Sequence, residues 1–189
     1  MKTNYKIIYV TGNKFKLKMA ESILEPLGIK VESKKIIDLP EIQSDNIEDV
    51  AIFSAKYARN ILNESVLKND SGLVIPELNN FPAAYSKYIE STITEDGILK
   101  LMEGKKNREA YFLEVLAFAK IDGEVKVFVS KTEGSIALNK SGENGWGYDK
   151  IFIPKGECKT LASFNEKEKI RFFNNDAYNE LANYLKNID

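Results

Sequence analysis

The chain has 189 residues, with 27 lysines and arginines against 28 aspartates and glutamates, one cysteine and no histidine. The missing histidine excludes an imidazole acid or base, and one cysteine cannot form an internal disulfide or a thiolate metal cluster. The net charge of -1 argues against a nucleic-acid coat or a membrane-surface binder, and no apolar stretch approaches the ~20 residues of a membrane span. We therefore expect a cytoplasmic globular protein whose chemistry rests on carboxylates, lysines, hydroxyls, a hard metal ion or backbone dipoles.

The first third of the chain alternates predicted strands and helices. Apolar, β-branched runs predict buried strands, and apolar residues at a spacing of about 3.6 predict helices. In chain order we expect a strand at 6–10, a helix at 15–27 ended by Gly28, a strand at 29–37, a break around Pro40, and a helix at 46–62 capped by Asn46.

The rest of the chain is less regular, but its strands and turns have clear signals. We expect strands at 65–68 and 73–75 around a turn at 69–72, a turn at 79–82, a helix at 95–102, a strand at 110–121, a hairpin turn at Asp122-Gly123, strands at 124–129 and 130–137, a glycine-rich loop at 139–149, a short strand at 150–154 and a helix at 165–186. This order predicts one mixed α/β unit over residues 1–189, with no linker and no repeat.

The segment Thr11–Lys16 lies between the first strand and the first helix. Free backbone amides and the helix dipole at such a point favour an anion, and Lys16 lies one turn into the helix, from where it can reach back to a phosphate. The alternative is ordinary capping of the helix by Thr11 or Asn13, with a solvated lysine. The residues alone leave both interpretations open.

Two carboxylates, Glu41 and Asp70, each follow a predicted strand. Such a pair can hold Mg²⁺ and activate a water molecule. Taken singly, each is as well explained as a surface acid or a turn former, since Asp70 begins a good turn sequence with Ser71 and Gly72.

The glycine loop carries two aromatic residues, Trp146 and Tyr148, with Asp149 beside them. Aromatic faces stack on nucleobases, and a carboxylate can accept hydrogen bonds from base N–H groups. The alternative is that one ring fills the core while the other lies on the surface. A basic cluster follows at Lys159, Lys167, Lys169 and Arg171, where a solvated helical face is the simpler explanation. Cys158 fits an inert, semi-buried residue because no acid or base partner type accompanies it.

Six segments in this order resemble the inosine triphosphate pyrophosphatase family, whose members hydrolyse non-standard purine nucleoside triphosphates. The segments are TGNKFK at 11–16, DLPEIQ at 38–43, NDSGL at 69–73, FPAAYSKYI at 81–89, GWGYDKIF at 145–152 and TLASFNEKEK at 160–169. They span nearly the whole chain in the family's order, and the sequence is most similar in character to archaeal members. Absence of a GxxxxGK[ST] or GxGxxG loop leaves other nucleotide folds without support.

The resemblance implies a role for each matching residue. Asp70 is the general base for the attacking water and, with Glu41, a ligand of Mg²⁺. The catalytic residues implied are Asp70, Lys16 and Lys169, and the substrate-binding residues are Thr11, Asn13, Lys16, Lys56, Ser71, Lys87, Trp146, Tyr148, Asp149, Lys169, Asn174 and Asn175. Within this set, Thr11, Asn13 and the lysines bind the triphosphate, while Trp146 stacks on the base.

The family also implies an architecture and partners. We expect a long mixed β-sheet with flanking helices, two lobes around a central cleft, a Mg²⁺ cofactor and a homodimer. The substrate is a nucleoside triphosphate, cleaved between the α- and β-phosphates to a monophosphate and pyrophosphate. We expect no nucleic-acid polymer and no membrane as partner.

Several positions depart from the family pattern. Asn69 stands where the first of two acids precedes Ser-Gly, Ala83 replaces a glycine, and Ser163 replaces a glutamate. The Ser-His-Arg motif that contacts the base is replaced by Phe173-Asn174-Asn175. Three hypotheses therefore stay open: an active pyrophosphatase, the same chemistry with a shifted base preference, and a non-catalytic nucleotide-binding or interaction protein.

Overall fold

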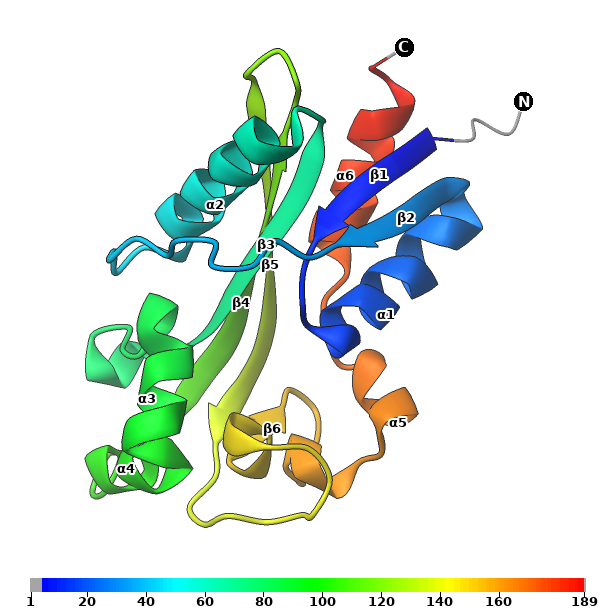
Figure 1. Cartoon of the computed structure of the whole chain (residues 1–189). Coiled ribbons are helices and arrows are strands. Elements are labelled where there is room, and N and C mark those ends of the chain that lie inside the picture. The colour runs from blue at the N-terminus through cyan, green and yellow to red at the C-terminus, as the bar shows by residue number, and fades with distance from the viewer. Residues whose placement is uncertain (1–4, 189) are drawn as a thin grey trace. The chain divides into compact units, whose positions relative to one another are not determined.

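The computed structural model describes residues 5–188, and Figure 1 shows their course. The strands are β1 (Tyr5–Val10), β2 (Ile29–Lys34), β3 (Val66–Val74), β4 (Glu109–Ala119), β5 (Val125–Ile136) and β6 (Phe152–Pro154). The α-helices are α1 (Lys14–Leu24), α2 (Ile47–Leu62), α3 (Ser86–Thr92), α4 (Thr94–Leu101), α5 (Glu166–Ile170) and α6 (Asp176–Lys186). Short 3-10 turns include η4 (Gly147–Lys150).

The strands form one six-stranded sheet in the order β2-β1-β3-β4-β5-β6. β1 pairs in parallel with β2 and with β3, whereas β5 and β6 are antiparallel. The sheet is therefore mixed, with helices beside it, which confirms the predicted fold class. The parallel pairs need long crossovers, and α1 and α2 lie in those connections.

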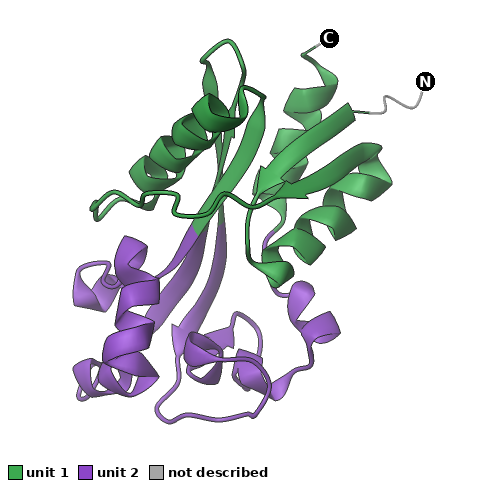
Figure 2. Ribbon diagram, in the orientation of Figure 1, with its two compact units in different colours: residues 1–70, 114–130, 175–189 green, residues 71–113, 131–174 purple. Residues whose placement is uncertain are grey.

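The chain divides into two compact units, coloured separately in Figure 2. Unit 1 comprises residues 1–70, 114–130 and 175–189, and unit 2 comprises residues 71–113 and 131–174. Strands β3, β4 and β5 each contribute residues to both units. The candidate site residues are therefore divided between two bodies, which are described separately.

Unit 1 is built around β1 and its parallel neighbours. Every residue of β1 from Ile7 to Val10 is buried, as the apolar run predicts for a central strand with both faces covered. Helix α1 packs against β2 and α6, and its buried side chains include Met19 and Leu24. This packing holds the end of β1 and the start of α1 in place.

Unit 2 has its own apolar core. Its buried members include Leu73, Ile98, Ile136 and Phe152, and the ring of Phe112 packs on Phe152 with centroids 4.6 Å apart. The η4 turn is tied into this core, because Tyr148 belongs to the same cluster. The glycine loop is thus anchored at one end by an aromatic side chain.

The predicted strands at 29–37 and at 124–137 differ from the structure. β2 ends at Lys34, three residues before the predicted end, and Asp38 in the following turn has a left-handed φ of 56°. The strands predicted at 124–129 and 130–137 are the single strand β5. Its residues alternate in burial along most of their length, and no turn signal divides them.

The turn predicted at 69–72 is wrong. β3 runs without interruption from Val66 to Val74, and Asp70 and Ser71 lie inside it. Gly72 is explained by a close approach and not by a turn: a Cβ there would overlap the carbonyl oxygen of Ala83. The place of β3 within the six-stranded sheet overrides the local turn preference of the Asp-Ser-Gly sequence.

We expect Gly72→Ala to lower the thermal unfolding midpoint by about 5–10 °C, because the added methyl meets rigid backbone and overpacking costs about 1–3 kcal/mol. Differential scanning fluorimetry would measure it. Gly12→Ala is the matched control, since a Cβ at Gly12 would meet only the flexible Lys35 side chain, 3.7 Å away. Equal midpoints for the two variants would contradict the close-packing explanation.

The helix predicted at 165–186 is two helices. α5 ends at Ile170, and α6 begins at Asp176 after Asn175. The break occurs because the Asn174 backbone amide donates to Thr132 Oγ1 at 2.9 Å, outside any helical pattern. A helix missing from the prediction, α3, precedes α4. The helices at 46–62 and 95–102 are confirmed as α2 and α4.

The described residues also bear on membrane insertion. From residue 5 to residue 188, no helix combines the length and the apolar character needed to cross a bilayer.

Candidate active site

The opening loop, residues 11–13, follows the carboxyl end of β1 in unit 1. Asn13 caps α1: its side-chain oxygen accepts hydrogen bonds from the amides of Phe15 at 2.9 Å and Lys16 at 3.2 Å. Thr11 Oγ1 in turn accepts from the Asn13 amide at 3.1 Å. The capping interpretation is therefore observed, and these amides are already used. Phosphate binding by the side chains of the loop stays a prediction.

The opening loop and the Asn69-Asp70 segment both belong to unit 1. The loop follows β1, whose Tyr9 is paired with Leu67 of β3. Ligands of parallel sheets bind beyond the carboxyl ends of the strands. An approach of the loop to Asp70 stays a prediction.

Asn69 is buried and forms a hydrogen bond with Glu114, a residue that the sequence analysis did not select. Its side-chain amide donates to Glu114 Oε1 of β4 at 2.7 Å. Tyr178 of α6 donates its hydroxyl to the same oxygen at 3.2 Å. A signal was present in the sequence, because Glu114 is the one charged residue in the otherwise apolar run 110–119 of β4.

The remaining predicted residues of the phosphate and metal sites occupy separate elements. Asp70 and Ser71 are partly buried in β3, whereas Glu41 is exposed in the segment before α2. Lys56 of α2 is exposed, and so is Lys87 of α3. Their convergence on one substrate stays a prediction.

The donor types suit a magnesium ion. Glu41 and Asp70 offer hard carboxylate oxygens, and Mg²⁺ is usually held by one or two carboxylates together with substrate phosphates and water. Over the described part of the chain, no three side chains among Asp, Glu, Cys and His gather in a metal-binding arrangement. A site of two carboxylates, completed by the triphosphate, is compatible with that finding.

The two aromatic residues of the glycine loop have different surroundings in unit 2. Trp146 is 64% exposed, whereas Tyr148 is 5% exposed and donates its hydroxyl to the Ser86 carbonyl at 2.9 Å. Tyr148 therefore matches the structural alternative, in which one ring fills the core. Trp146 retains an accessible ring face, as stacking on a base requires.

Asp149 and Lys169 form a close ion pair. The Lys169 ammonium lies 2.6 Å from Asp149 Oδ2 and also donates to the Asn144 carbonyl at 3.1 Å. Lys169 is only 4% exposed, so the solvated-face explanation of the basic cluster is wrong for this residue. It describes Lys167 and Arg171, which are exposed. Cys158 is also exposed, not semi-buried as expected.

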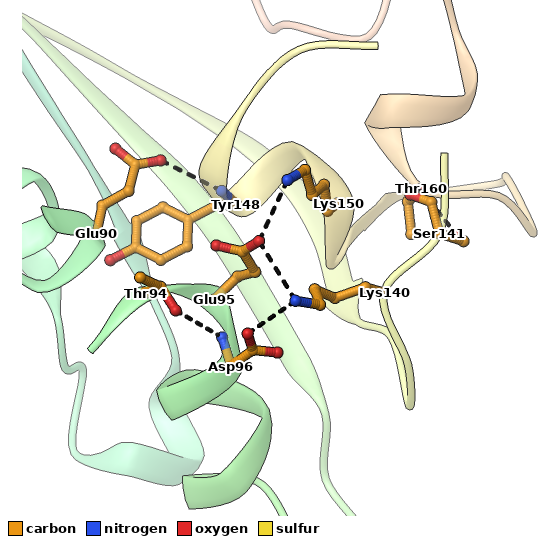
Figure 3. Close-up of polar contacts among 9 residues, drawn as sticks. All are labelled: Glu90, Thr94, Glu95, Asp96, Lys140, Ser141, Tyr148, Lys150 and Thr160. Carbon is orange, nitrogen blue, oxygen red and sulfur yellow. Dashed lines mark hydrogen bonds and ion pairs between the residues drawn. The ribbon is translucent and has the colours of Figure 1, made fainter. Parts of the chain in front are cut away.

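Glu90 of α3 is a second residue that the sequence did not reveal. Its carboxylate accepts from the Tyr148 amide at 3.3 Å, and Figure 3 shows it directed at the η4 turn. A Cβ on Gly147 would overlap this carboxylate, which explains a glycine with a φ of 53° there. Burial raises the pKa of Glu90 to about 7, and the charges of Asp149 and Glu95 act in the same direction.

We expect the deprotonation of Glu90 to lower the free energy of unfolding as the pH rises from about 4.5 to 7. The folded state binds this proton more tightly than the unfolded chain, so the stabilisation is complete at low pH and is lost as the pH passes the folded pKa. Urea unfolding would give the free energy of unfolding at pH 5 and at pH 8. The difference between these two values should be smaller for Glu90→Gln than for wild type. Glu103→Gln, which changes an exposed glutamate, is the control and should behave as wild type. If Glu90→Gln kept the wild-type difference between pH 5 and pH 8, the raised pKa of Glu90 would be contradicted.

Ion pairs between Glu95 and two lysines, drawn in Figure 3, connect η4 and the start of the glycine loop to α4. Glu95 of α4 is 8% exposed and lies 3.4 Å from the ammonium of Lys150 and 3.8 Å from that of Lys140. Lys140 also contacts Asp96 at 2.7 Å. These contacts hold both sides of the glycine loop, so Trp146 projects from an anchored turn.

The residues that replace the base-contacting motif lie between α5 and α6. The Asn174 side chain is partly exposed, and its backbone is fixed by Thr132. Asn175 has a buried Oδ1 for which the described residues provide no hydrogen-bond partner. A buried acceptor without a partner is costly, so a donor from a ligand would satisfy it.

Comparison with known proteins gives matches over nearly the whole chain. The family model described as the Ham1 family matches residues 7–182. A dITP/XTP pyrophosphatase of Methanopyrus kandleri is 41% identical over 183 residues, covering 96% of this chain and 97% of that protein. One from Thermococcus kodakarensis is 40% identical over 182 residues, with coverage of 96% and 97%.

Solved structures agree with the sequence matches. The Ham1 protein of Staphylococcus aureus is 28% identical with a TM-score of 0.81, covering 97% of this chain and 100% of that one. A HAM1 protein from Coxiella burnetii is 27% identical, also with a TM-score of 0.81, and the coverage is 96% and 98%. By sequence and by fold, this chain belongs to the Ham1 family.

Proposed function

We propose that this chain hydrolyses non-standard purine nucleoside triphosphates to a nucleoside monophosphate and pyrophosphate. The observation that carries the proposal is about 40% identity, over nearly the whole chain, to proteins named dITP/XTP pyrophosphatases. Among the open hypotheses, this identity supports the two catalytic ones over the non-catalytic one.

The candidate residues have different proposed roles in binding and catalysis. Lys16, Lys87 and Lys169 are the cations proposed to bind the triphosphate, with the hydroxyl and amide side chains of the opening loop. Asp70 is proposed to take a proton from the water that attacks the α-phosphorus, which needs no histidine. Because Lys169 is neutralised by Asp149, we expect it to position the glycine loop as well as to attract phosphate.

Magnesium is the proposed cofactor, held by Glu41 and Asp70. When bound, it would offset charge on the phosphate oxygens. We also propose a homodimer, as the family resemblance implies, and a location in the cytoplasm, as the sequence led us to expect. Light scattering on the purified protein would give the oligomeric state.

The base preference is where we expect this chain to differ from its family, because Asn174 and Asn175 replace the base-contacting motif. Trp146 offers a ring face for stacking, but Asn174 and Asn175 carry no positive charge to place at a 6-oxo group. An asparagine side chain both donates and accepts, so it discriminates less sharply between oxo and amino purines. We therefore propose the same reaction with a broader base range.

The test is pyrophosphate release from a panel of triphosphates with Mg²⁺. Inosine, xanthosine, guanosine and adenosine triphosphates should be compared by kcat/KM, with light-scattering and thermal-shift measurements as controls of protein quality. A kcat/KM for inosine triphosphate only slightly above that for adenosine triphosphate would support the broader base range. A much larger kcat/KM for inosine triphosphate would contradict it. Binding without turnover across the panel would favour the non-catalytic alternative.

A further inference from the structure

Trp146 lies between two glycines of unit 2, and each glycine closely approaches another side chain. Gly145 has a φ of 84° and Gly147 has a φ of 53°, so both are in the left-handed region that favours glycine. A Cβ on Gly147 would overlap the Glu90 carboxylate, and a Cβ on Gly145 would overlap the Asp149 carboxylate. The backbone on both sides of Trp146 is therefore confined, although the Trp146 side chain belongs to an exposed residue.

Glu90 of α3 adds a directed contact on the second side. Its Oε1 atom accepts a hydrogen bond from the Tyr148 amide at 3.3 Å, and Figure 3 shows the carboxylate pointing toward that nitrogen. Tyr148 is 5% exposed, so little water can replace Glu90 as the partner of this amide. A carboxyl group accepts hydrogen bonds whether or not it is ionised, so the contact does not depend on the protonation state of Glu90.

The helix that carries Glu90 is itself fixed in unit 2. The Ser86 hydroxyl, one helical turn before Glu90, accepts from the Leu73 amide of β3 at 2.8 Å. The Ser86 carbonyl accepts from the Tyr148 hydroxyl at 2.9 Å. Helix α3 therefore holds Tyr148 at two points, the backbone amide and the end of the ring, and Glu90 provides the one nearer to Trp146.

We propose that Glu90 is a positioning residue for base recognition: by accepting from the Tyr148 amide, it holds the Trp146 ring in the orientation that stacks on the purine. Glu90 acts through the backbone of the glycine loop and does not itself contact the base. This role rests on the proposed function and deepens it at the same site, because Glu90 belongs to none of the six segments that carry the family resemblance.

Glu90→Met and Glu90→Gln are the matched variants, because both keep the length of the side chain and remove its ionisable group, but only glutamine keeps a strong acceptor. With inosine triphosphate and Mg²⁺, we expect the KM of Glu90→Met to rise about five- to tenfold. Its kcat should stay within about threefold of wild type, because stacking binds the substrate and the transition state alike. Glu90→Gln should keep both constants within about twofold of wild type. Glu103→Met, which changes an exposed glutamate, is the control and should change neither constant.

Trp146 is the one tryptophan of the chain, so its fluorescence reports on the glycine loop in the absence of substrate. Time-resolved anisotropy should show a larger nanosecond component for Glu90→Met than for wild type, because released loops move on that timescale. Glu90→Gln and Glu103→Met should match wild type. If Glu90→Met does not fold, Gly147→Ala disturbs the same contact from the loop and should raise both the KM and the nanosecond component.

A double variant separates an action through Trp146 from a general loosening of the protein. Trp146→Ala removes the stacking ring, so adding Glu90→Met to it should raise the KM by no more than about twofold further. A residue that only stabilises the fold would have the same effect on the KM with and without the Trp146 ring.

The outcomes separate this role from the proposed function. An unchanged KM or an unchanged anisotropy in Glu90→Met would overturn the role of Glu90. An equal rise of the KM in Glu90→Gln, or a full further rise in the Trp146→Ala background, would also overturn it. None of these results would contradict the proposed function. A wild-type protein without turnover would contradict the proposed function, and the anisotropy comparison would still test whether Glu90 holds the loop.

Discussion

The Asp70→Asn variant should lose about 100-fold or more in kcat, the effect typical of removing a positioned general base. Asparagine has nearly the same shape as aspartate but cannot take a proton from water. Asp70 lies inside β3, so the backbone around it is held by strand pairing and should tolerate the change. Initial rates of pyrophosphate release with inosine triphosphate at saturating Mg²⁺ would measure the loss.

Asp122→Asn provides the control for Asp70. Asp122 is an exposed aspartate in the turn between β4 and β5, and its contact with Lys120 lies at the surface. It should keep wild-type turnover. An Asp70→Asn variant that folds and stays within a few-fold of the wild-type rate would show that another group activates the water.

Lys169→Met should destabilise the folded protein by about 3 kcal/mol, because it leaves the Asp149 carboxylate without its cation in a partly buried place. Lys169 is 4% exposed, and the ammonium that the change removes bonds both Asp149 and the Asn144 carbonyl. Equilibrium urea unfolding would give the free energy difference. The loss should be accompanied by lower activity, because the glycine loop that carries Trp146 is held at Asp149.

Lys167→Met is the matched control, two residues earlier on α5 and exposed. It should change the free energy of unfolding by no more than about 0.5 kcal/mol, as is usual for surface positions. If the two variants were equally stable, Lys169 would be a dispensable surface lysine, and its buried ion pair would have no energetic consequence.

The sequence predicted the regular elements well where apolar periodicity was strong. α2 was found because its buried residues recur at helical spacing, and β1 was found because its apolar, β-branched run is continuous. The turn expected at 69–72 failed because local preference was weighed without the neighbouring strands, which keep Asp70 and Ser71 in an extended ladder. The division of the last helix failed because Asn174 is fixed by Thr132, 42 residues away in the sequence.

The candidate site shows the same division between local and long-range information. Residue types at motif positions were sufficient to select Asp149 and Lys169, but only the fold shows that they neutralise each other. Tyr148 and Trp146 are alike in the sequence, and packing makes one structural and the other accessible. Glu90 and Glu114 belong to no motif, and their importance comes from residues brought to them by other elements.

The products formed from inosine triphosphate by the wild-type protein with Mg²⁺, identified by phosphorus NMR, test the central claim most directly. The account predicts inosine monophosphate and pyrophosphate in equal amounts, with no orthophosphate, because water attacks the α-phosphorus. Inosine diphosphate with orthophosphate, or an unchanged triphosphate, would contradict it.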